Sequence, residues 1–200
     1  MLNHCGGPMN RVPVTVLMLA LAGTAIASPA SAQEWMTLFD GSSLDGWRTL
    51  GNANWKLGDG AVSADTGSGF LVSSESYGDF ELRVEFWVDE PANSGIYMRC
   101  QDPEQFTDRT CYEANIFDTR ADQTYRTGGV VHLAAPSAVI NTGGQWNTYL
   151  IRAEGQRLIV TLNGTQLVDV TDDQFNEGPF GLQYAAGVVR FRNVQIRELD

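Results

Sequence analysis

Basic residues are scarce in this sequence of 200 residues, which has 13 lysines and arginines against 24 aspartates and glutamates and a formal net charge of −11. A chain this acidic lacks the basic patches that bind nucleic acid or anionic membranes, so we expect neither as a partner. The acidic composition favours solubility and a neutral or cationic ligand, but it does not identify that ligand.

Histidine and cysteine are also rare. Of two histidines and three cysteines, His4 and Cys5 fall in an N-terminal segment that we expect to be removed. The one remaining histidine, His132, excludes a histidine-rich metal site and any mechanism that needs two imidazoles, so we expect no metal and no other cofactor. The remaining cysteines, Cys100 and Cys111, predict a disulfide in an exported chain, with two buried free thiols as the alternative.

The segment before residue 33 has the features of a secretory signal peptide. Arg11 is its only charged residue, an apolar stretch runs from Val12 through Ala27, and Ala30-Ser31-Ala32 forms an A-x-A cleavage pattern. A permanent membrane anchor is the weaker interpretation, because the stretch is short and Pro13 lies at its start. We therefore expect cleavage after Ala32, export to the periplasm or the medium, and one mature domain of residues 33–200.

Short apolar segments separated by turn residues make up the rest of the chain. Phe80–Phe86 alternates strictly between apolar and polar residues, which predicts a half-buried strand. Asn163-Gly164 between two apolar runs predicts a β-hairpin, because a type I′ turn needs positive φ at both central positions. Further strands are expected at residues 61–64, 69–72, 95–100, 112–117, 129–133, 147–153, 181–184 and 188–198, and a helical turn at 44–47 or 171–175. This pattern indicates an all-β sandwich or barrel.

Nine segments carry a resemblance to a known family: Trp35–Trp47, Trp55–Gly60, Tyr77–Leu82, Asn93–Arg99, Tyr112–Asp118, Gly144–Asn147, Leu162–Gly164, Gly178–Gln183 and Phe191–Val194. In this order they resemble the 3-keto-disaccharide hydrolase domain family over essentially the whole mature chain. The resemblance implies an all-β, concanavalin A-like jelly roll of two antiparallel sheets, one of them concave and carrying a carbohydrate site. It also implies cleavage of glycosides whose sugar is oxidised at carbon 3.

Two positions depart from the family pattern. Tyr184-Ala185-Ala186-Gly187 follows Gln183, where the family often has an Asp-His-Gly-like stretch, and Asn115 replaces the family's usual glutamine. If the missing imidazole takes part in proton transfer, its loss puts the activity in doubt but leaves the fold unaffected.

A carboxylate is the natural acid or base for glycoside cleavage in a chain with so little histidine. On the strand expected at 112–117, Glu113 and Asn115 lie on the face opposite the apolar residues, and Tyr97 and Arg99 do so on the neighbouring strand. Arg99 beside Glu113 would lower the pKa of that carboxyl and could stabilise an oxyanion, so both are candidate catalytic residues. The alternative is a solvated strand face.

Four further residues are candidates for substrate binding together with Asn115 and Tyr97, as polar or stacking groups of the cleft: Trp87, Asp118, His132 and Gln183. Arg99 would also orient the sugar. Trp87 is chosen because it lies on an otherwise charged strand face; an edge or interface tryptophan is the alternative. Solvated loop charge is the alternative for Asp118. For His132 the alternatives are a core or rim histidine and a catalytic one.

The register of the two candidate strands contains a conflict. If Cys100 lies directly opposite Cys111, Met98 faces Glu113, whereas a shift by one residue is needed to bring Arg99 opposite Glu113. A bulge, or a disulfide outside the regular ladder, would reconcile the two arrangements.

Three functions are compatible with the sequence. The first is an exported hydrolase or lyase for 3-keto-glycosides. The second is a non-catalytic carbohydrate-binding module on the same fold. The third is a structural or cell-envelope interaction domain, which would expose an apolar patch and lack a convergent polar cleft.

Overall fold

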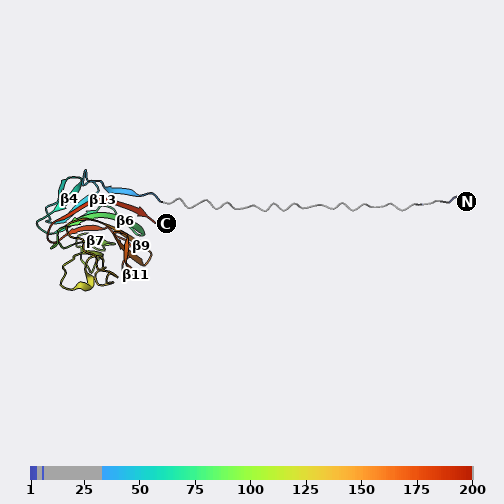
Figure 1. The fold of residues 1–200 in the computed structure, drawn as a ribbon. Coiled ribbons are helices and arrows are strands. Elements are labelled where there is room, and N and C mark those ends of the chain that lie inside the picture. Colours follow the sequence, from blue (N-terminus) through green and yellow to red (C-terminus); the bar gives the residue numbers. More distant parts are fainter. Residues whose placement is uncertain (4–5, 7–32, 200) are drawn as a thin grey trace. The chain divides into compact units, whose positions relative to one another are not determined.

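A computed structural model describes residues 1–3, 6 and 33–199, and β-strands dominate this part of the chain (Figure 1). The elements are β1 (Met36–Phe39), β2 (Trp47–Gly51), β3 (Lys56–Gly58), β4 (Ala61–Ala64), β5 (Gly69–Ser73), β6 (Phe80–Val88), β7 (Ser94–Met98), β8 (Tyr112–Ile116), the 3-10 helix η1 (Gln123–Tyr125), β9 (Trp146–Glu154), β10 (Arg157–Leu162), β11 (Thr165–Thr171), β12 (Gly181–Tyr184) and β13 (Val189–Glu198).

The chain divides into two units, residues 1–32 and residues 33–200. The expected signal peptide falls in the first unit, and its apolar stretch and the cleavage site after Ala32 lie outside the described residues, so both stay predictions. No helix in the described ranges has the length and apolar character needed to cross a membrane.

The strands of the second unit form two antiparallel sheets. The large sheet has the order β11-β10-β9-β6-β13-β4-β3, with β1 also paired to β13, and Figure 1 shows β4, β13, β6 and β9 side by side. The small sheet has the order β2-β5-β12-β7-β8. The expected all-β sandwich of two antiparallel sheets is therefore confirmed.

Apolar side chains from both sheets meet in one core. On β6, Phe80, Leu82, Val84 and Phe86 are buried in it and the residues between them face outward, as the strict alternation predicted. On β8 the core face carries Tyr112, Ala114 and Ile116, so the polar residues of that strand point away from the core.

The predicted β10–β11 hairpin is present, with φ of 50° at Asn163 and 82° at Gly164, the left-handed conformation that these two residues tolerate. The strand expected at 129–133 is wrong. Val130 forms only isolated bridges there, because a tight turn returns the chain to it and the Leu133 and Ala134 amides both donate to its carbonyl.

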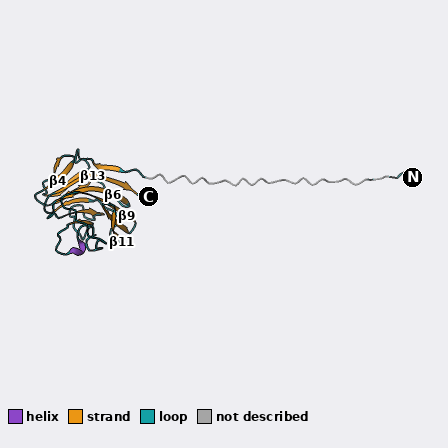
Figure 2. Ribbon diagram, in the orientation of Figure 1, coloured by secondary structure: helices purple, strands orange, loops and turns teal. Residues whose placement is uncertain are grey.

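The expected helical turn at 44–47 or 171–175 is also wrong. Within the described residues the one helical element is η1, where the Asp122 side chain accepts a hydrogen bond from the Thr124 amide. Figure 2 shows this element outside both sheets, in the loop that follows β8.

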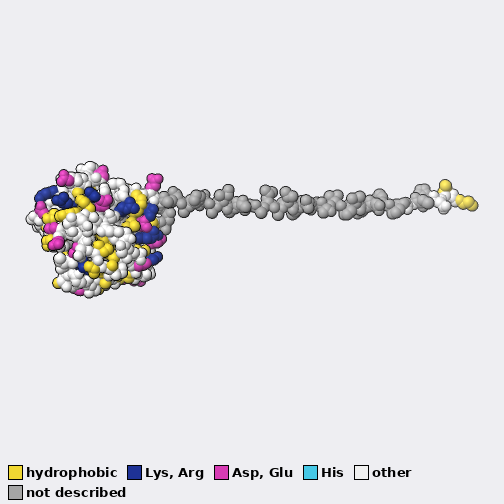
Figure 3. Space-filling view, viewed as in Figure 1, with side chains coloured by type: hydrophobic (Ala, Val, Ile, Leu, Met, Phe, Trp, Pro, Cys, Tyr) yellow, Lys and Arg dark blue, Asp and Glu magenta, His cyan; other side chains and the backbone are white. Residues whose placement is uncertain are grey.

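Charged side chains of both signs are interspersed on the face of the domain seen in Figure 3. On the outer face of the large sheet, Glu81 pairs with Arg152 and Arg197, and Glu85 pairs with Arg192. These pairs place arginines next to carboxylates rather than in a continuous basic patch.

Candidate functional site

The candidate site lies on the outer face of the small sheet, away from the core. In the β7–β8 ladder Tyr97 is paired with Glu113 and Gly95 with Asn115. Because side chains alternate across a strand, all four positions share the face opposite to Ile96 and Ala114, which are buried in the core. Two of the expected site residues, Tyr97 and Glu113, are thus brought together.

Strand β12 brings Gln183 to the same face. It pairs with Phe70 of β5 on one side, and the β12–β7 ladder continues the row toward β7. The Gln183 side-chain amide donates a hydrogen bond of 3.0 Å to the Tyr97 hydroxyl. A row of polar groups therefore crosses the sheet from Gln183 through Tyr97 to Glu113.

The observed register differs from both arrangements that the sequence allowed, since Tyr97, and neither Met98 nor Arg99, lies opposite Glu113. The ladder ends at the pair Met98–Tyr112, and the Cys100–Cys111 disulfide, which confirms the predicted pairing, lies beyond it. The disulfide therefore lies outside the regular ladder, as one of the expected alternatives had it, but it does not bring Arg99 opposite Glu113.

The structure does not bring Arg99 to Glu113. Its φ of 49° interrupts the alternation of the strand, and its side chain, only 1% exposed, leaves the outer face. The guanidinium donates to the carbonyls of Gly78, Gly155 and Phe175 and to the Asp79 carboxylate, at 2.8–3.1 Å. Arg99 connects three backbone segments and does not line the site.

Glu113 is the most perturbed acid of the outer face. Its side chain is 6% exposed and lies across Gly95, where an added Cβ would be only 2.9 Å from Glu113 Oε1. Burial raises the pKa of Glu113 to about 7, and a hydrogen bond with Tyr97 opposes that rise without cancelling it. Burial also raises the pKa of Tyr97, so its phenol stays protonated and remains a hydrogen-bond donor.

Two charged residues from loops act on Glu113. The negative charge of Asp108 adds to the rise in the Glu113 pKa, and the positive charge of Arg120 opposes it. The Asp108 carboxylate is also hydrogen-bonded to the His132 ring, with 2.8 Å between Asp108 Oδ2 and His132 Nε2. The backbone N–H of Val131 donates to the Glu113 carbonyl, so the segment that carries His132 runs alongside β8. His132 therefore lies at the rim of the site.

Asn115 and Asp118 support the loop that follows β8 and do not line an open cleft. Asn115 is fully buried, and its side-chain amide donates to the carbonyl of Tyr125. The Asp118 carboxylate accepts hydrogen bonds from the Thr127 hydroxyl and from Thr142. These contacts tie the loop of residues 117–129 to the loop that precedes β9.

Trp87 lies on the other side of the sandwich. It belongs to β6 of the large sheet and alternates there with the core residues Phe86 and Val88, so its ring is on the outer face of that sheet. The Arg190 guanidinium stacks 5.1 Å from the centre of its ring. Trp87 is therefore not brought together with Glu113.

A cavity of about 400 Å³ lies on the same face of the small sheet, over β5 and β12, and Gln183 is part of its lining. Its walls include the rings of Phe70 and Phe106, whose centres are 5.4 Å apart. The Phe70 ring also meets the ring of Tyr97, at 4.9 Å. The cavity thus continues directly from the polar row that ends at Glu113.

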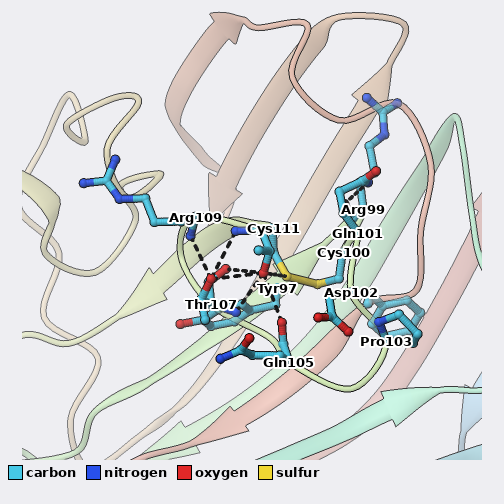
Figure 4. The surroundings of a disulfide bond; sticks show 12 residues. Tyr97, Arg99, Cys100, Gln101, Asp102, Pro103, Gln105, Thr107, Arg109 and Cys111 are labelled. Carbon is cyan, nitrogen blue, oxygen red and sulfur yellow. Dashed lines mark hydrogen bonds between the residues drawn. A yellow bond between two sulfur atoms is a disulfide. The ribbon is translucent and has the colours of Figure 1, made fainter.

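The segment of residues 101–110, here named the disulfide loop, forms one wall of the site. Figure 4 shows the Cys100–Cys111 bond joining its two ends, with Gln105, Thr107 and Arg109 between them. The loop contributes Phe106 to the cavity and Asp108 to the surroundings of Glu113.

Sequence reasoning did not assign Phe70, Phe106 or Asp108 to the site. One usable signal was present, because a disulfide that closes a short loop beside the candidate strands makes that loop a natural wall of the site. In the described part of the chain, no three His, Cys, Asp or Glu side chains converge in a way that could hold a metal ion.

Comparison with known sequences identifies the family of this domain. Residues 34–197 match the profile of the 3-keto-alpha-glucoside-1,2-lyase-like domain family. The 3-keto-disaccharide hydrolase of Bacteroides thetaiotaomicron is 30% identical over 87 residues, covering 37% of this chain. The chain spans only 30% of the length of that curated relative.

Solved structures share the fold. A Parabacteroides distasonis protein named as a candidate glycosyl hydrolase superposes with a TM-score of 0.75 at 20% identity, covering 83% of this chain and 94% of its own. A carbohydrate-binding module from Bacillus subtilis gives 0.62 at 22% identity, covering 76% and 96%. Such similarity shows the fold alone, the expected concanavalin A-like jelly roll. Since the family profile spans nearly the whole of the described domain, the chain belongs to the 3-keto-alpha-glucoside-1,2-lyase-like domain family.

Proposed function

We propose that this domain is exported and cleaves glycosides whose sugar carries a keto group at carbon 3, with Glu113 as the acid–base residue. The observation that supports this most is the Glu113 carboxyl itself. It is buried at the floor of the site, its pKa is raised to about 7, and it contacts a phenol that stays protonated. A carboxyl with a pKa near neutrality can both accept and return a proton.

The proposed chemistry starts at carbon 2 of the oxidised sugar. The adjacent ketone acidifies the hydrogen on this carbon, so the Glu113 carboxylate removes that proton and its electron pair delocalises onto the ketone oxygen. Collapse of this enolate breaks the bond between carbon 1 and the glycosidic oxygen. The protonated Glu113 then returns the proton to the leaving oxygen, and water adds to the unsaturated sugar in a later step.

The developing negative charge on the ketone oxygen needs a hydrogen-bond donor. Arg99 was the candidate from the sequence, but its guanidinium is held by three backbone carbonyls and Asp79. We assign this role instead to the Gln183 amide and to the Tyr97 hydroxyl beside it. The Tyr97 proton is donated to the Glu113 carboxylate at first and turns to the ketone oxygen once Glu113 has taken up the substrate proton.

Substitution of Glu113 tests the proposal. The Glu113→Gln variant keeps the shape of the side chain but cannot exchange a proton, so we expect kcat for a 3-keto-disaccharide to fall by roughly 10²- to 10⁴-fold. Glu75→Gln, at an exposed glutamate outside the site, is the matched control and should keep the wild-type rate. A folded Glu113→Gln protein with wild-type turnover would exclude Glu113 as the acid–base residue.

A second function, a non-catalytic carbohydrate-binding module, is favoured by one observation. Tyr184-Ala185-Ala186-Gly187 lacks the histidine that the family often has after Gln183, and Ala185 instead lines the cavity. Incubation with a panel of oxidised and ordinary disaccharides, followed by mass spectrometry and calorimetry, separates the two. Saturable binding without any product would establish the binding module and exclude the lyase.

A further inference from the structure

The cavity over β5 and β12 has no part in the proton transfer proposed above. It lies beside Glu113 rather than around it, because Glu113 is on β8 and two strands, β7 and β12, lie before Phe70 on β5. Neighbouring strands are about 4.8 Å apart, so roughly 14 Å separate the strand of Glu113 from that of Phe70. A ligand that occupies both places must extend across the strands.

The lining of the cavity combines apolar rings with polar groups. Phe70, Phe106 and Leu50 supply apolar surface, and Ser68, Gln105 and Gln183 supply groups able to form hydrogen bonds. A pyranose has the same combination, with apolar C–H faces and a rim of hydroxyl groups. A volume of about 400 Å³ falls within the range of small-molecule sites.

Gln183 connects the cavity to the proposed reaction site. Its side-chain nitrogen donates to Tyr97, while its Oε1 atom is buried without a hydrogen-bond partner in the described part of the chain. An unpaired buried acceptor is unfavourable, and a ligand hydroxyl is a donor of the kind that would satisfy it. One side chain would thus contact both halves of a substrate.

The wall formed by Phe106 is fixed by several contacts. Gly181 lies beneath the ring, since a Cβ at that position would be 2.8 Å from Phe106 Cε2. The disulfide closes the loop, the backbone N–H of Gln101 donates to the carbonyl of Thr110 at 2.9 Å, and the Arg48 guanidinium donates to the carbonyl of Pro103. The wall is therefore preorganised, which lowers the entropic cost of binding a ligand against it.

We propose that this cavity is the subsite for the leaving-group sugar, so that the domain selects 3-keto-disaccharides over 3-keto-glycosides with a small leaving group. This inference rests on the proposed function, because it places the oxidised ring over Gly95 and Glu113. The second ring then lies over β12 and β5, between Phe106 and Ser68.

The test compares two substrates that share the oxidised ring, a 3-keto-disaccharide and the corresponding methyl 3-keto-glycoside. Ser68→Trp fills the cavity from its exposed edge, so we expect KM for the disaccharide to rise about tenfold or more, while kcat/KM for the methyl glycoside stays unchanged. Phe106→Ala removes the opposite wall and should change the disaccharide values in the same direction. Ser137→Trp, on an exposed loop outside the cavity, is the matched control.

Each outcome decides a separate question. If the Ser68→Trp and Phe106→Ala variants lose activity equally on both substrates, or on neither, the subsite is excluded while the proposed function stands. If the wild-type protein cleaves neither substrate, the proposed function fails, and calorimetry then decides the subsite. Wild-type protein that binds the disaccharide more tightly than the methyl glycoside, with the difference lost in Ser68→Trp, supports it; equal affinities exclude it.

Discussion

At the scale of single residues, the site depends on a carboxyl held in a place that disfavours its charge. Glu113 is 6% exposed, and the absence of a side chain at Gly95 lets it lie flat against the sheet. Burial is the largest cause of its raised pKa, and Asp108, on the disulfide loop, adds to the effect. The loop therefore contributes a charge as well as a wall.

Substitution of Asp108 tests that contribution. Asp108→Asn removes a negative charge near Glu113 and keeps the shape of the side chain, so we expect the Glu113 pKa to move below its wild-type value of about 7. Burial remains, so the pKa should stay above the ordinary value of 4.5. The measurement is a titration of the Glu113 carboxyl carbon by NMR, which does not depend on any activity.

Asp102→Asn is the matched control for this titration, because Asp102 carries the same charge on the same loop and is not among the groups that shift Glu113. The control should leave the Glu113 titration unchanged. An unchanged titration in Asp108→Asn itself would show that the loop charge does not reach Glu113.

At the scale of elements, Arg99 ties together segments that are distant in the chain. Arg99 is only 1% exposed, so its guanidinium bonds to protein groups rather than to water. Its four hydrogen-bond acceptors belong to the residues just before β6, to the β9–β10 turn and to the segment before β12. Removing the guanidinium takes this donor away from three backbone carbonyls and the Asp79 carboxylate. An acceptor that stays shielded from water is then unfavourable by about 1–3 kcal/mol.

Arg99→Met tests whether the residue is structural. Methionine fills part of the volume but donates no hydrogen bond, so we expect the free energy of unfolding to fall by about 3 kcal/mol or more, measured by chemical denaturation. The folded fraction should keep the wild-type kcat on a 3-keto-disaccharide. A stable variant with a large loss of kcat would instead return Arg99 to the catalytic role that the sequence suggested.

The strands around the site show which features could be predicted from the sequence and which could not. Alternation located β6, β8 and β12 within a residue or two, and Asn163-Gly164 fixed a hairpin, because these signals are local. The positive φ of Arg99 does not follow from local alternation. It turns that side chain off the outer face, and the β7–β8 ladder ends at the residue before it. Glu113 was therefore chosen from the strand pattern together with the family resemblance, whereas Asp108 and Phe106, on a loop without periodicity, were not assigned to the site.

At the scale of the whole molecule, two sets of carboxyls contribute to stability with opposite pH dependence. Burial alone would raise the pKa of Glu81, but hydrogen bonds and charges from Arg197 and Arg152 outweigh it and lower that pKa. The stabilisation from such a group is present above its unfolded pKa and is lost as the pH falls. Glu113 acts in the other direction, since its folded pKa is raised.

The Glu113 contribution can be isolated by comparing wild-type protein with Glu113→Gln across pH. Between the ordinary pKa of 4.5 and the folded pKa of about 7, the folded protein binds more protons at Glu113 than the unfolded chain, so this stabilisation is lost as the pH rises. A shift of this size corresponds to about 3 kcal/mol. The free energy of unfolding of Glu113→Gln, measured relative to wild type by chemical denaturation, should therefore increase by up to that amount between about pH 5 and about pH 8. Glu75→Gln should show no such trend, and a flat difference for Glu113→Gln would mean that the buried carboxyl is ionised without penalty. The expected trend would show that the proposed acid–base residue destabilises the fold at neutral pH, which links the chemistry of the site to the stability of the sandwich that carries it.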